Sequence, residues 1–169
     1  MRNYIIILLL LLEINVYGQR LDIQIDYPVP INSLSGIISP NLQYNFGLKK
    51  ENLLLGLGTS VTWLKSHDNN EVLNYNIDLG LNCKFIITPL INSYPYFNVG
   101  FTRFQNSGTH SDGLKTEIGI SICPATTRHQ LGLHLAYRQY FLDKLNLSET
   151  IESTKGTFGM FLVGLHFHF

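Results

Sequence analysis

Two short segments combine the residue types of a hydrolase triad. They are Ser66-His67-Asp68 and His110-Ser111-Asp112, and each holds a hydroxyl, an imidazole and a carboxylate. Such groups act as nucleophile, base and orienting acid in acyl transfer and hydrolysis. The same residue types are also ordinary in polar loops. We therefore assign no catalytic residues and expect no enzyme, and we keep a lipid-modifying enzyme as the alternative.

Three histidines could together bind a metal ion. His166 and His168 alternate along the chain, so they share one face of an extended strand, and His134 has the same facing. His129 lies in a predicted turn nearby. A metal site needs more ligands at a defined geometry. We interpret these histidines as polar filler, and we expect no metal and no cofactor.

The strongest structural signal is an alternation of apolar and polar residues, clearest over residues 73–85. Odd positions such as Leu73 and Ile77 are apolar, whereas even positions such as Asn74 and Asp78 are polar or small. This period of two is typical of a strand whose two faces contact different solvents. The segment is longer than the strand of about 5–6 residues that is usual in soluble proteins.

The same alternation recurs along the chain and predicts eight strands. Glycines within these segments fall on the polar face, where they relieve crowding inside a narrow barrel. The connections alternate between a short set and a longer, more polar set, which includes residues 105–113 and 143–155. Aromatic residues fall near both expected edges of the apolar face. The predicted strands are 21–27, 41–48, 53–64, 73–85, 97–102, 115–122, 131–138 and 161–169.

The composition narrows the function classes. Charged residues make up 14% of the chain, against about 25% in soluble domains. Lysine plus arginine equals aspartate plus glutamate at 12 each, so the net charge gives no reason to expect a nucleic-acid partner.

Residues 1–18 have the charged start, apolar middle and small-residue end of a signal peptide. This order of residue types predicts a signal peptide over residues 1–18, and we expect the remaining residues, 19–169, to form a single domain.

An apolar strand face without a spanning helix leaves two interpretations. One is a transmembrane β-barrel, which satisfies every backbone polar group in lipid. The other is a soluble secreted barrel that binds an apolar ligand, in the manner of a lipocalin. Alternation alone does not say which face is inward. The loop lengths, the glycine facing and the aromatic distribution favour an all-β, eight-stranded antiparallel up-and-down transmembrane barrel.

In that barrel the polar face is the interior, and its charges must pair. An eight-stranded barrel is just wide enough for side chains to fill, and unpaired buried charges are costly. We expect a salt-bridged plug and no open pore. Arg103 has lipid-facing parity and could pair with phosphate. Cys83 and Cys123 have opposite facings, which predicts two free thiols. The inward charges are Asp22, Asp26, Asp78, Lys84, Lys115, Glu117 and Arg138.

The final segment, residues 161–169, alternates and terminates in Phe169. This ending resembles the assembly signal of Gram-negative outer-membrane barrels. With the signal peptide and eight strands, the chain is similar to the small outer-membrane β-barrel family, OmpX-like or like the OmpA barrel domain. The resemblance implies an outer-membrane location and a structural or surface-interaction role. It also implies a monomer whose partners are lipid, lipopolysaccharide and, through Phe169, the barrel assembly machinery.

Overall fold

A closed antiparallel barrel makes up the described part of the chain. The computed structural model describes residues 17–30, 34–47, 53–66, 70–106, 109–125, 130–142 and 156–169. No helix in these ranges is long and apolar enough to cross a membrane. The strands are β1 (Tyr17–Pro30), β2 (Ser35–Gly47), β3 (Leu53–Lys65), β4 (Glu71–Cys83), β5 (Phe85–Thr88), β6 (Ile91–Asn106), β7 (Thr109–Pro124), β8 (Gln130–Leu142) and β9 (Gly156–His168).

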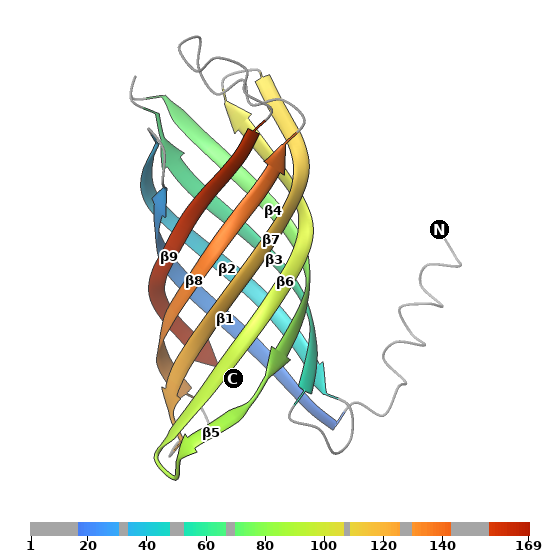
Figure 1. Cartoon of the computed structure of the whole chain (residues 1–169), viewed down its shortest axis with the longest axis vertical. Coiled ribbons are helices and arrows are strands. Elements are labelled where there is room, and N and C mark those ends of the chain that lie inside the picture. Colours follow the sequence, from blue (N-terminus) through green and yellow to red (C-terminus); the bar gives the residue numbers. More distant parts are fainter. Residues whose placement is uncertain are drawn as a thin grey trace, which may run out of the picture.

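The strands form one sheet that closes on itself (Figure 1). The order is β4-β3-β2-β1-β9-β8-β7-β6-β5, and a further pairing of β4 with β6 completes the ring. The short strand β5 continues from β4 and pairs with β6 beyond one end of the barrel, so eight strands form the wall. Closure removes the exposed strand edges on which other chains could pair.

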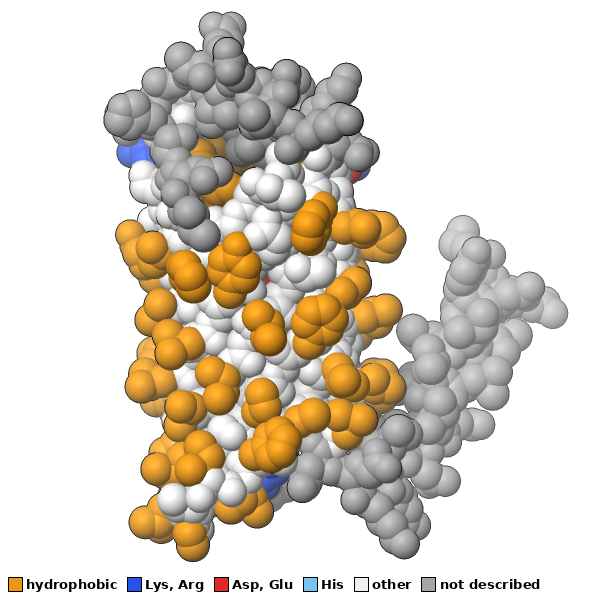
Figure 2. Space-filling view, viewed as in Figure 1, with side chains coloured by type: hydrophobic (Ala, Val, Ile, Leu, Met, Phe, Trp, Pro, Cys, Tyr) orange, Lys and Arg blue, Asp and Glu red, His pale blue; other side chains and the backbone are white. Residues whose placement is uncertain are grey.

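The two faces of the wall differ sharply in polarity. In the middle of β4, Ile77 and Leu79 are 64% and 69% exposed, whereas Asp78 between them is 1% exposed. On the face of the barrel shown in Figure 2, apolar side chains are spread along the length of the wall, and almost no charged side chains lie among them. The polar residues that alternate with these apolar residues along each strand point into the interior. This arrangement is the opposite of a lipocalin, in which the apolar residues face inward, and the soluble-barrel interpretation therefore does not fit.

All eight predicted strands are present, but β1, β6 and β7 are at least twice as long as the sequence predicts. Residues 105–113 were expected to be an outer loop, whereas β6 and β7 pair continuously from Ile91–Pro124 up to Asn106–Thr109. The prediction was wrong here because this polar, glycine-containing composition is typical of a loop, whereas the described residues pair locally across a hairpin, Gln105 with His110 and Asn106 with Thr109. The expected loop 28–37 is likewise shortened by β1 and β2. The predicted signal peptide lies almost wholly outside the described residues.

An apolar cluster fills one end of the interior, which the alternation alone had suggested would be polar throughout. Phe104 packs edge-on against Tyr140 and Phe158, with ring centroids 4.9 and 5.9 Å apart. Because Phe104 lies near the β6–β7 connection, this cluster occupies the end opposite the C-terminus (Figure 1). Its other buried members include Leu34, Leu64, Val72, Leu142, Met160 and Leu162.

Candidate functional site

A network of buried charges crosses the middle of the barrel. Glu117 accepts hydrogen bonds from Arg138 Nε, from Lys115 Nζ at 3.3 Å and from the Tyr96 hydroxyl at 2.7 Å. Lys115 Nζ also lies 2.6 Å from Asp78 Oδ2. These side chains are almost fully buried. Each carboxylate therefore meets a cation, as the sequence led us to expect.

Arg138 extends this network across the full width of the barrel. Its Nη1 donates to Thr62 Oγ1 at 2.9 Å and to the Tyr140 hydroxyl at 3.3 Å. Thr62 lies on β3, which stands opposite β8 in the ring of eight strands. A single guanidinium thus joins two opposite walls and contacts the aromatic cluster.

A second branch runs from the network through His134. The Tyr96 hydroxyl lies 2.7 Å from His134 Nε2, and His134 Nδ1 lies 2.6 Å from Asp26 Oδ1. All three side chains face inward and are buried. His134 is therefore part of the ion-paired interior. Its ring centroid lies 5.9 Å from that of His166.

Glycines on intervening strands allow these pairs to meet. Gly100 of β6 stands between Asp78 of β4 and Lys115 of β7 in the register. A Cβ atom at Gly100 would overlap the Asp78 carboxylate and the backbone oxygen of Ile77. Without that Cβ, the lysine reaches across the strand to the aspartate. Gly164 of β9 stands in the same way between Asp26 and His134.

Replacing Gly100 with alanine is expected to destabilise the barrel by about 1–3 kcal/mol, because the added methyl group overpacks a filled interior. Denaturant unfolding of the detergent-refolded protein measures this loss. Gly58→Ala is the matched control. Gly58 also faces inward, but a Cβ atom there would lie 3.4 Å from its nearest neighbour, the backbone oxygen of Leu42, which is an ordinary contact. Equal stability of the two variants would contradict the role given to Gly100.

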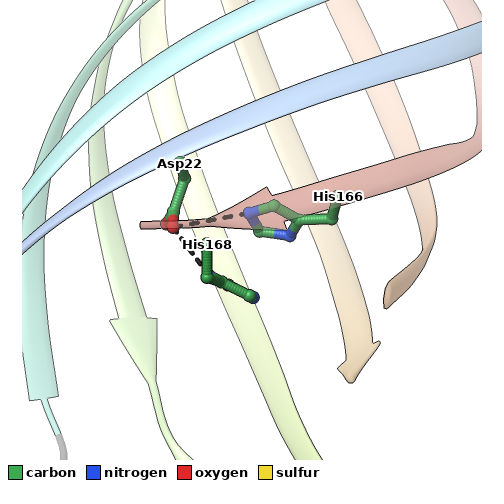
Figure 3. Close-up of side chains that lie close together, drawn as sticks. All are labelled: Asp22, His166 and His168. Atoms are coloured by element: carbon green, nitrogen blue, oxygen red, sulfur yellow. Dashed lines mark hydrogen bonds and ion pairs between the residues drawn. The ribbon is translucent and has the colours of Figure 1, made fainter. Parts of the chain in front are cut away.

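A separate cluster lies toward the end of the barrel that carries the C-terminus (Figure 3). Asp22 of β1 pairs in register with His168 of β9, and His166 lies two residues earlier on the same face. His168 Nδ1 is 2.6 Å and His166 Nε2 is 3.6 Å from the same oxygen, Asp22 Oδ1. The candidate ligand atoms of the three residues all lie within 4.8 Å of one another.

Polar neighbours fix the orientation of this cluster. Arg20 lies 2.7 Å from the second carboxylate oxygen, Asp22 Oδ2, which also accepts a hydrogen bond from Asn45. Ser121 hydrogen-bonds to His166 Nδ1. Within the described residues, His166 Nε2 is buried and has no hydrogen-bond partner. The sequence pointed to both histidines, whereas Asp22 as their partner emerges only from the β1–β9 register.

The triad-like segments do not form an assembled site in the described residues. His67 and Asp68 lie outside the described residues, as does His129. Ser111 faces inward on β7, whereas His110 and Asp112 are exposed on the opposite face, as alternation along a strand requires.

The remaining polar residues singled out from the sequence are also accounted for. Asp112 binds Arg103 through two contacts of 2.6 and 2.8 Å, so Arg103 has a protein partner that the sequence did not reveal. Cys83 and Cys123 are both free thiols, as predicted. Of the predicted inward charges, Lys84 is only half-buried. Arg20, which the sequence did not single out, pairs with Asp22.

The fold and interior define a class of protein: a closed eight-stranded antiparallel barrel with an apolar exterior and an ion-paired interior. Solved structures of outer-membrane proteins are similar to this chain over nearly its whole length. Neisserial surface protein A has a TM-score of 0.65 at 14% identity, covering 90% of this chain and 97% of that one. A major outer membrane protein from Thermus thermophilus has a TM-score of 0.61 at 12% identity, covering 90% and 100%.

The outer membrane enzyme PagL is also similar, with a TM-score of 0.58 at 14% identity, covering 87% of this chain and 97% of that one. No protein-family model matches the sequence, and no curated protein matches it. At these identities the likeness establishes the fold, which is that of small eight-stranded outer-membrane barrels. These relatives include an enzyme and proteins not described as enzymes, so the fold alone assigns no activity.

Proposed function

We propose that this chain is a small integral outer-membrane β-barrel protein with a structural or surface-interaction role and a closed interior. The observation that carries the proposal is the polarity of the wall. A soluble protein rarely exposes contiguous apolar surface of this extent, since water penalises it. A bilayer removes that penalty, and barrel closure satisfies the backbone hydrogen bonds that lipid cannot.

The filling of the interior supports a structural role over a transport role. The Arg138 network and the aromatic cluster occupy successive levels of a barrel that is only wide enough for its own side chains. An ion would have to displace paired charges at one level and apolar rings at the other. We therefore propose that the barrel conducts no solutes, and that surface interactions belong to its loops.

Arg103 is the group that we propose to meet the membrane surface, where headgroup phosphate would compete with Asp112 for its guanidinium. Both side chains are about half-exposed at the loop end of the β6–β7 hairpin. Guanidinium groups bind phosphate with two parallel hydrogen bonds, as Arg103 already binds the Asp112 carboxylate. We propose lipid and lipopolysaccharide headgroups as partners at this level, and a monomeric barrel.

Fractionation of cells that express the full chain tests the proposed location. We expect the protein in the outer-membrane fraction, extractable only with detergent, and we expect its gel mobility to change when the sample is heated. A protein released with the soluble periplasmic contents would contradict the proposal. The proposed absence of conduction is tested in the same material by planar-bilayer recording, where stable channel openings would contradict it.

Deletion of Phe169 tests the proposed partner in assembly. Phe169 pairs with Leu21 through two backbone hydrogen bonds, and its side chain is half-exposed on the outside of the barrel. We propose that this terminal aromatic is recognised by the barrel assembly machinery, so its deletion should lower the outer-membrane level of the protein. Phe169→Tyr is the control, since it keeps an aromatic end. Normal levels of the deletion variant would contradict this proposal.

A further inference from the structure

The cluster of Asp22, His166 and His168 contains more ligand atoms than its hydrogen bonds use. Two imidazole nitrogens, His166 Nε2 and His168 Nδ1, face one carboxylate oxygen. The distance of 3.6 Å between His166 Nε2 and Asp22 Oδ1 is too long for a hydrogen bond. It matches two ligands of one metal ion, since bonds of about 2.0–2.2 Å place tetrahedral ligands a little over 3 Å apart.

A buried nitrogen without a partner makes an ion at this position favourable. His166 is 2% exposed, and its Nε2 is left without a hydrogen bond in the described structure. Leaving such a group unsatisfied costs about 1–3 kcal/mol. The other ring nitrogen, Nδ1, is held by the Ser121 hydroxyl. This is the arrangement of metal-bound histidines, whose second nitrogen is fixed by an oxygen that sets the ring orientation.

The carboxylate is held in the same way. Arg20 and Asn45 both contact Asp22 Oδ2, which leaves Oδ1 directed at the imidazoles. The remaining contact, 2.6 Å between His168 Nδ1 and Asp22 Oδ1, has the length of a hydrogen bond. An ion would take the place of the proton in that bond, and the neutral imidazole would keep its proton on Nε2.

We propose that Asp22, His166 and His168 bind one divalent transition-metal ion, with zinc(II) as the ion to test. Two imidazoles and one carboxylate suit zinc and similar ions and are poor ligands for calcium or magnesium, which prefer oxygen. Three protein ligands leave one position of a tetrahedral ion for water. The site belongs to the barrel interior, so it stands apart from the proposed location and surface role.

Zinc(II) binding to the purified, refolded full-length barrel without an affinity tag tests this site. The background variant His67→Gln/His110→Gln/His129→Gln removes every histidine of the chain except His134, His166 and His168 and should still bind one zinc(II) per barrel. In this background His166→Gln or His168→Gln should weaken binding more than about 100-fold, and Ser121→Ala by about 10–100-fold. His134→Gln, at another buried histidine, should leave the affinity unchanged.

Heat-modifiable gel mobility verifies that each variant is folded. Zinc X-ray absorption of the background variant gives a readout that needs no substitution in the cluster, and it should show two imidazole ligands and only light-atom neighbours. Absence of zinc binding, equal affinity after loss of both cluster histidines, or fewer than two imidazoles on the bound ion would each overturn the proposal.

Discussion

Replacing Glu117 with glutamine is expected to lower the free energy of unfolding by about 3–5 kcal/mol, the usual effect of breaking a buried ion pair on one side. Glu117 is the only carboxylate in contact with Arg138 among the described ion pairs, and it also contacts Lys115 and Tyr96. Glutamine keeps the size of the side chain but leaves the Arg138 guanidinium buried without a counter-charge. Denaturant unfolding in detergent measures the loss.

A double variant separates this loss from a general sensitivity of the interior. Glu117→Leu with Arg138→Met removes both charges and leaves the pair of Lys115 and Asp78, so we expect it to recover most of the stability. Glu71→Gln, at the exposed start of β4, should change stability by no more than about 0.5 kcal/mol. Strictly additive losses at positions 117 and 138 would show that the two side chains do not act as a pair.

Replacing Ile77 with arginine is expected to cost about 2–4 kcal/mol, because a charge at the middle of the lipid face must enter hydrocarbon. Ile77 stands at the centre of β4 and is 64% exposed. In water such an exposed position would tolerate arginine within about 0.5 kcal/mol. The measurement is unfolding of the protein refolded into lipid vesicles. The change in the free energy of unfolding of Ile77→Arg therefore distinguishes a wall that faces lipid from a wall that faces water.

Leu131→Arg is the matched control for depth. Leu131 is also exposed and apolar, but it is the second residue of β8, close to one end of the wall. The cost of arginine falls to about 0–1 kcal/mol near the membrane interface. Equal costs at positions 77 and 131, or no cost at either, would contradict a lipid-facing wall that is deepest at Ile77.

The strands and their facings could be predicted from the sequence because alternation is a local signal. The facing of Asp78 and Glu117 follows from their immediate neighbours, whatever the rest of the chain does. Pairing is different, because it depends on register between distant strands. The full length of β6 and β7 was missed for another reason: residues 105–106 and 109–113 pair locally in a hairpin, but their polar composition lacks the apolar alternation that marks a strand.

For the buried network, the sequence could predict which side chains point into the barrel, but it could not predict which of them contact one another. Parity placed Arg138 inside the barrel, but its contact with Thr62 depends on how two opposite strands are staggered. The aromatic cluster had a signal that could have been used, because Phe104 and Phe158 share the inward parity of their strands. The role of Gly100 as a gap between Asp78 and Lys115 appears only when the register of three strands is known.

Fluorescence quenching of Trp63 tests most directly whether the outer wall of this barrel contacts lipid. Trp63 is the single tryptophan of the chain and lies half-buried on β3 among outward-facing residues. In vesicles, we expect strong quenching by lipids brominated along their acyl chains and weak quenching by iodide in the water. Quenching by iodide without quenching by brominated lipid would contradict a membrane-spanning barrel.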